Sequence, residues 1–70
     1  MPISRQELIR RLRALGFGEP EIGGKHAAMR GRGVKIAIPN PHGGREIDDA
    51  LLVRILRQAG VTRQEFDEVK

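Results

Sequence analysis

The residues best suited to chemistry gather in one stretch, GGKHAAMRGRGVKIAIPNPH, residues 23–42. It contains both histidines of the chain, His26 and His42. Histidine is the side chain whose unperturbed pKa lies nearest neutrality, so either can act as a general acid or base. The same stretch carries four cations that can bind phosphate: Lys25, Arg30, Arg32 and Lys35.

These residue types are suited to cutting RNA without a metal ion. A base removes the proton of the 2′-hydroxyl group, an acid protonates the leaving 5′-oxygen, and cations stabilise the phosphorane between them. His26 is the candidate base or acid. His42 is either the second proton-transfer group or a residue that positions RNA.

Other chemistries find little support in the sequence. The chain has no cysteine, and its only serine, Ser4, is placed to cap a helix, which leaves no serine or cysteine nucleophile. Two histidines without cysteine or a suitably spaced carboxylate make a poor metal site, so no metal or other cofactor is expected. The segment Arg30-Gly31-Arg32-Gly33 is similar to an RGG fragment, but a hairpin turn explains it better.

A first helix is predicted over residues 4–15. Ser4 and Glu7 have the spacing of a capping box. An apolar stripe at helical spacing follows, and Gly16 is a natural stop. The stripe consists of Leu8, Ile9, Leu12 and Leu15.

A β-hairpin is predicted next, with strands over residues 26–30 and 34–38. The segment Gly31-Arg32-Gly33 joins them, its two glycines free to take positive φ. Residues 21–23 form at most a short edge strand, because Pro20 disfavours a central one. The predicted core face consists of Ala27, Met29, Val34, Ile36 and Ile38.

Strand alternation then places His26 on the solvent face of the hairpin, together with Ala28 and Arg30. Lys35 and Ala37 belong to the same face of the second strand. A cation-rich sheet face with small side chains between the charges leaves room for a ligand. An ordinary solvated sheet face is the alternative.

A second helix is predicted over residues 49–59, with Asp48 as its N-cap and Gly60 as its end. Thr62 and Glu65 form another capping box, which opens a short helix that buries Phe66. The order of helix, small antiparallel sheet, helix and short helix indicates an α+β fold.

Composition limits the class of protein. Seventy residues make one domain, and without cysteine, tryptophan or tyrosine its core must be mainly aliphatic. The net charge is +4, and 10 of the 13 basic residues are arginine, which favours nucleic acid or an acidic protein as the partner. The sequence contains no membrane span and no export signal, so a cytoplasmic location is expected.

Several motifs occur in a specific order along the chain. Gly16-Phe17 ends the first helix, and Gly24-Lys25-His26 opens a strand. Pro39-Asn40-Pro41-His42 ends the hairpin, and Glu46-Ile47 follows. The closing segment is ILRQAGVTRQEF, residues 55–66. In this arrangement the chain resembles the HicA, or YcfA-like, family of toxin ribonucleases over nearly its full length.

The resemblance implies a single domain over residues 1–70 with a fold like that of a double-stranded-RNA-binding domain. Such a fold has a helix, a three-stranded antiparallel sheet and a helix, followed here by a short C-terminal helix. It also implies an endoribonuclease, or mRNA interferase, of a type II toxin–antitoxin system. That enzyme cleaves single-stranded messenger RNA without metal and blocks translation, and a HicB-type antitoxin covers its active face. The catalytic histidine of the family corresponds to His26.

Two departures from the family pattern stand out. Lys25 replaces the usual serine before the histidine, and Ala50-Leu51 replaces the usual Gly-Thr before the last helix. Two other hypotheses therefore remain open. The first is a non-catalytic RNA-binding module of the same fold. The second is a protein-binding subunit without RNA activity, whose basic face meets an acidic partner.

Overall fold

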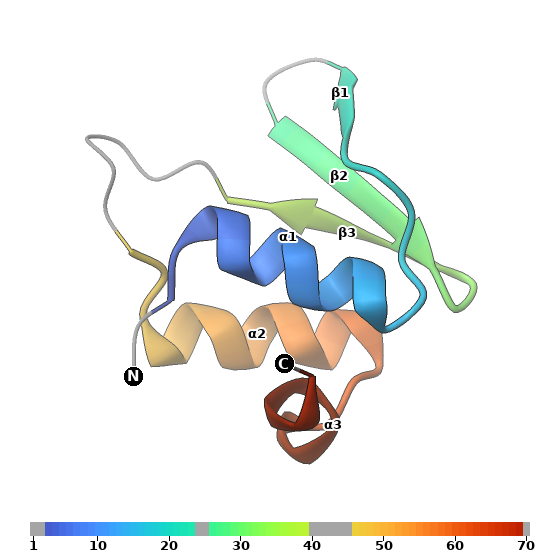
Figure 1. The fold of residues 1–70 in the computed structure, drawn as a ribbon. Coiled ribbons are helices and arrows are strands. Elements are labelled where there is room, and N and C mark those ends of the chain that lie inside the picture. The colour runs from blue at the N-terminus through green and yellow to red at the C-terminus, as the bar shows by residue number, and fades with distance from the viewer. Residues whose placement is uncertain (1–2, 24–25, 40–45, 70) are drawn as a thin grey trace.

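The computed structural model describes residues 3–23, 26–39 and 46–69 (Figure 1). Its helices are α1 (Arg5–Ala14), α2 (Asp49–Ala59) and α3 (Arg63–Glu68), and its strands are β1 (Glu21–Gly23), β2 (His26–Gly31) and β3 (Val34–Ile38). The α+β class predicted from the sequence is confirmed. Among the described residues, no helix is long and apolar enough to cross a membrane.

The strands pair in antiparallel fashion in the order β1-β2-β3. Met29 lies opposite Ile36, and Ala28 lies opposite Ala37 on one side and Glu21 on the other. The short edge strand predicted near residues 21–23 is confirmed as β1. A separate antiparallel bridge joins Ile3 to Ile47, so the segments that lead into α1 and α2 lie side by side.

Local capping fixes where the helices begin. The side chain of Asp48 accepts a hydrogen bond from the amide of Leu51, which confirms the predicted N-cap of α2. The predicted capping box of Thr62 and Glu65 is present in α3. Ser4 also caps α1, but the Glu7 carboxylate binds arginines of the same helix, so only the Ser4 half of that predicted box is observed.

The hairpin turn differs from its prediction. The residues with positive φ are Arg32 (50°) and Gly33 (78°), which form a two-residue turn, whereas Gly31 belongs to β2. Gly31 is needed for another reason. A Cβ atom at this position would lie 2.7 Å from the Phe17 ring and 2.8 Å from the α-carbon of Phe17. The missing side chain therefore lets the hairpin pack directly against Phe17.

The core lies between one face of the sheet and the helices. Its fully buried members include Leu8 and Leu12 of α1, Leu52 of α2 and Phe66 of α3. Ala27, Met29, Ile36 and Ile38 also belong to it, as predicted. Figure 1 shows α1 and α2 on one side of the sheet, with α3 below α2.

Two residues of the hairpin differ from prediction. Val34, predicted to face the core, is 38% exposed, because it directly follows the turn at the tip of the hairpin. Ala28 lies on the predicted open face and outside the contiguous core cluster, but it is only 9% exposed. Its short side chain on the central strand is sheltered by the taller neighbours Glu21 and Arg30, which form an ion pair.

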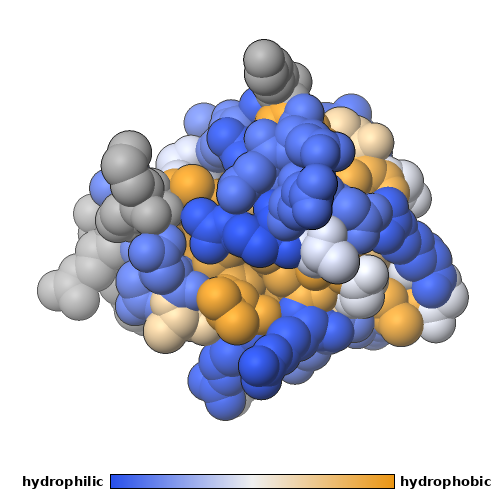
Figure 2. All heavy atoms as spheres, turned by 90° about the horizontal axis from the view of Figure 1, so that it is seen from below, coloured by the Kyte–Doolittle hydropathy of each residue, from blue (hydrophilic) through white to orange (hydrophobic). Residues whose placement is uncertain are grey.

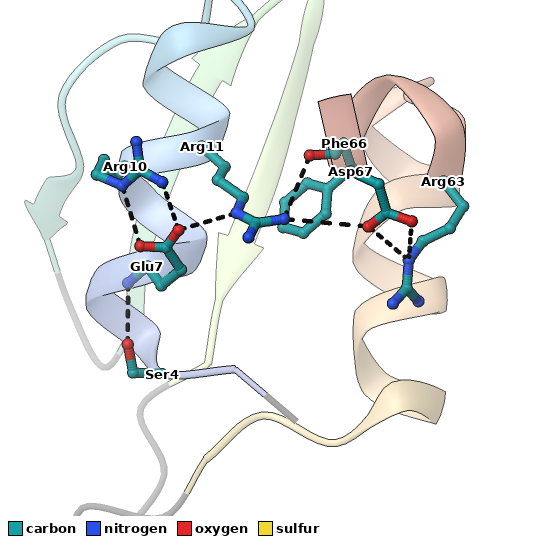
Figure 3. A network of polar contacts seen from close by, with 7 residues as sticks. All are labelled: Ser4, Glu7, Arg10, Arg11, Arg63, Phe66 and Asp67. Atoms are coloured by element: carbon teal, nitrogen blue, oxygen red, sulfur yellow. Dashed lines mark hydrogen bonds and ion pairs between the residues drawn. The ribbon is translucent and has the colours of Figure 1, made fainter. Parts of the chain in front are cut away.

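A polar network joins α1 to α3 (Figure 3). The Arg11 guanidinium lies 5.0 Å from the centre of the Phe66 ring and donates to the Phe66 carbonyl at 3.4 Å. Its Nε also donates to Glu7 at 2.9 Å. A cation–π interaction and hydrogen bonding thus hold α3, which has only six residues, against the first helix.

Candidate functional site

His26 is the first residue of β2, and it pairs with Gly23 of β1. The predictions for Lys25 and His42 lie outside the described residues, and the description of His26 is limited to its backbone. The structure therefore places the backbone of the candidate catalytic residue at one end of the hairpin. Its orientation toward solvent stays a prediction from strand alternation.

Arg30 and Lys35 lie directly opposite each other at the other end of the hairpin. Both are exposed, and they line a shallow depression of about 320 Å³ together with Gly31, Gly33 and Val34. Like charges in directly opposite positions repel. Glu21 relieves that repulsion, since its carboxylate lies 3.0 Å from the Arg30 guanidinium.

The length of the strand separates these cations from His26. Arg30 lies four positions after His26, which corresponds to roughly 13 Å in an extended strand. The backbone of His26 and the two cations therefore lie at opposite ends of the hairpin.

Arg32 contacts the helices. Its Nε donates to the Leu15 carbonyl at 3.2 Å, and its guanidinium lies 3.3 Å from Glu65. The Thr62 amide and the Arg32 guanidinium both donate to the Glu65 carboxylate and lower its pKa. Arg32 thus ties the turn of the hairpin to the end of α1 and the start of α3.

One cation near the other end of the sheet was not singled out from the sequence. The Arg5 Nε donates to the carbonyl of Pro39 at 3.2 Å. Because Ala27 pairs with Ile38, the register brings Pro39 opposite His26. Arg5 therefore anchors α1 at the end of the sheet where β2 begins. Its position in the first turn of a helix carries no sequence signal for such an interaction.

Clustering of metal ligands is defined only for the described residues, which exclude the side chains of both histidines. Among the described residues, no group of three or more histidine, cysteine, aspartate or glutamate residues is arranged to hold a metal ion. The strongest carboxylate perturbation is that of Glu7, where Arg10 and Arg11 lower the pKa to about 2. These two partly exposed ion pairs lie on α1 and involve no residue of the hairpin (Figure 3).

These features define a small basic α+β domain whose hairpin carries cations on its exposed face. A family model for the HicA toxin of bacterial toxin–antitoxin systems matches residues 5–61. The chain belongs to this family, which makes it a toxin of a toxin–antitoxin system and implies an antitoxin partner. No curated protein matches the chain. The match extends from the first residue of α1 to Val61, and α3 follows it.

Proposed function

We propose that this protein is a toxin that cleaves single-stranded messenger RNA without metal and thereby blocks translation in the cytoplasm. The observation that carries the proposal is the family match over residues 5–61. The order of helix, antiparallel sheet and helix supports a single domain like a double-stranded-RNA-binding domain. A HicB-type antitoxin is proposed to cover the active face.

His26 is proposed as the general acid or base, because it opens the strand that leads to the exposed cations. Lys25, next to it in sequence, would stabilise the phosphorane, and His42 would position the RNA. Arg30 and Lys35 would hold a flanking phosphate. Arg32 would contribute to RNA binding, with Glu65 competing with phosphate for its guanidinium.

A second candidate is a non-catalytic RNA-binding module. Lys25 stands where the family usually has serine, and the exposed cations lie roughly 13 Å from the histidine position. Both features suit a domain that binds RNA phosphates but does not cleave RNA. A third candidate binds only protein, and it predicts no RNA affinity at moderate salt.

A cleavage assay with matched variants separates these functions. Wild type, His26→Ala and Lys35→Ala would be mixed with a long single-stranded RNA in EDTA. We expect cleavage by the wild type, loss of cleavage but retained binding in His26→Ala, and a raised KM in Lys35→Ala. Because Lys35→Ala removes one phosphate-binding cation, it should also reduce the slope of the logarithm of the RNA-binding constant against the logarithm of the salt concentration by about 0.7.

Each result has a definite meaning. Equal cleavage by wild type and His26→Ala would refute the assignment of His26. RNA binding without cleavage by the folded wild type would establish the binding module. If the protein neither binds nor cleaves RNA at low salt, the protein-binding subunit would be the one remaining candidate function.

A further inference from the structure

β3 forms an edge of the sheet whose outer side is not paired with another strand among the described residues. The two-residue turn closes on the pair Gly31 and Val34, which is therefore hydrogen-bonded. Alternation then directs the N–H and C=O groups of Val34, Ile36 and Ile38 toward β2. Those of Lys35 and Ala37 point away from the sheet, and both residues are exposed.

A groove runs beside this edge. It has a volume of about 270 Å³ and lies between β3 and α2. Ile38 and Ile55 are buried at its base, Leu51 is half-buried, and Arg54 and Gln58 of α2 are exposed. Figure 2, which views the molecule from the side of α2 and α3, shows apolar surface bordered by hydrophilic side chains.

The edge is bounded at both ends. The two-residue turn lies at one end. At the other, the Pro39 carbonyl, which alternation also directs outward, accepts a hydrogen bond from Arg5. The open segment is therefore short, and the outward backbone groups of Lys35 and Ala37 have no strand partner in the part of the chain that the structure describes. An edge strand beside a helix, with a groove between them, is the geometry that accepts an extended peptide as an additional strand.

Charge identifies the kind of peptide. The described residues that line the groove include one cation, Arg54, and no acidic side chain. An added strand would direct alternate side chains into the apolar groove and the others toward Lys35 on the open face. The occupant that fits has apolar residues at alternate positions with carboxylates between them.

A second copy of the chain fits less well. Pairing of two β3 edges would bring together the Lys35 and Arg54 cations of both copies. The net charge of +4 on each chain adds to that repulsion.

We propose that the outer edge of β3 and the groove beside α2 bind an extended acidic segment of a partner protein by strand addition. The proposal takes from the family only the existence of a protein partner. It does not depend on ribonuclease activity or on the role of His26.

The test uses a synthetic peptide, acetyl-Glu-Val-Glu-Val-Glu-amide, and amide hydrogen exchange followed by NMR. At saturating peptide, the amides of Lys35 and Ala37 should exchange at least about tenfold more slowly, because each becomes hydrogen-bonded. A peptide with lysine in place of each glutamate is the matched control and should give no protection.

Two variants test the site. Arg54→Glu should weaken peptide binding by about fivefold, whereas Arg57→Glu, the same charge change outside the groove, should leave it unchanged. Ala37→Pro removes an outward N–H without breaking the ladder to β2 and should abolish the protection of the Lys35 amide.

The remaining outcomes overturn the proposal. These are no change at millimolar peptide, protection at other amides, equal binding of the basic peptide, or equal weakening by the two charge reversals. Slowed exchange that depends on protein concentration without peptide would indicate a second copy instead. The RNA cleavage of Arg54→Glu, measured separately, should equal that of the wild type, so failure of this proposal is distinct from failure of the ribonuclease proposal.

Discussion

Gly31→Ala should destabilise the protein by about 3 kcal/mol, the upper end of the usual cost of overpacking. The added Cβ would lie 2.7 Å from Cδ1, 2.9 Å from Cγ and 2.8 Å from the α-carbon of Phe17. Rotation of the ring relieves only the clashes with atoms of the ring itself. Relief of the clash with the α-carbon requires the backbone of Phe17 to move, although its amide is held by the Leu12 carbonyl at 3.0 Å.

A loss of this size is easily measured. One kcal/mol lowers the melting temperature of a domain this small by about 4–8 °C, so Gly31→Ala should melt roughly 12–24 °C below the wild type. The chain has no tryptophan or tyrosine, so urea and thermal unfolding should be followed by far-UV circular dichroism.

Gly18→Ala is the matched control. Gly18 lies in the same region of packing, since its amide donates to the Arg30 carbonyl at 2.8 Å. An added Cβ there would meet only that oxygen, at an ordinary 3.6 Å. We expect a change within about 0.5 kcal/mol. A similar loss in both variants, or none in Gly31→Ala, would refute the claim that close packing against Phe17 excludes a side chain at position 31.

Three further predictions concern the helices. Phe66→Ala should lower the free energy of unfolding by about 3–5 kcal/mol, because it empties a fully buried site. Urea unfolding measures this loss, and a loss below about 1 kcal/mol would contradict the burial of Phe66. Asp48→Ala should lower the free energy of unfolding by about 1 kcal/mol and weaken the helical circular dichroism signal. An unchanged unfolding midpoint would argue against the capping role of Asp48. Arg10 and Arg11 lower the pKa of Glu7 from 4.5 to about 2, so its stabilisation is present above pH 4.5 and lost as the pH falls toward 2. The stability difference between wild type and Glu7→Gln should therefore shrink over that range, and a difference independent of pH would contradict it.

The elements with local signals were predictable from the sequence. Asp48, Thr62 and Glu65 mark helix starts through hydrogen bonds within three residues, so short-range chemistry is enough to place them. The alternation of Ile36 and Ile38 with Lys35 and Ala37 likewise indicates a strand with one buried face.

The sequence-based predictions are wrong where contacts between segments distant in the sequence determine the structure. Val34 continues the apolar alternation, but its place beside the turn leaves it exposed. The sequence pattern indicates a turn glycine at Gly31, whereas the approach of Phe17 is what requires it, and Arg32 takes the positive φ instead. The partners of Arg32 lie at the end of α1 and in α3, so strand alternation could not indicate them.

The placement of the candidate site is only partly accessible to sequence reasoning. Alternation assigns Arg30 and Lys35 to one face, and the register confirms that they are opposite each other. It does not indicate the ion pair of Arg30 with Glu21, which needs β1 at the correct register. Nor does it indicate the anchoring of Arg5 at Pro39, which depends on how α1 crosses the sheet.

The bridge between Ile3 and Ile47 has a consequence for the order of folding. The hairpin of β2 and β3 joins neighbouring segments through a two-residue turn, so its closure costs little chain entropy. The bridge joins residues that flank the whole of α1 and the sheet, so its closure costs more and is expected late. Substitutions in the hairpin should therefore slow folding, whereas weakening the bridge should mainly speed unfolding, a division that stopped-flow kinetics can measure.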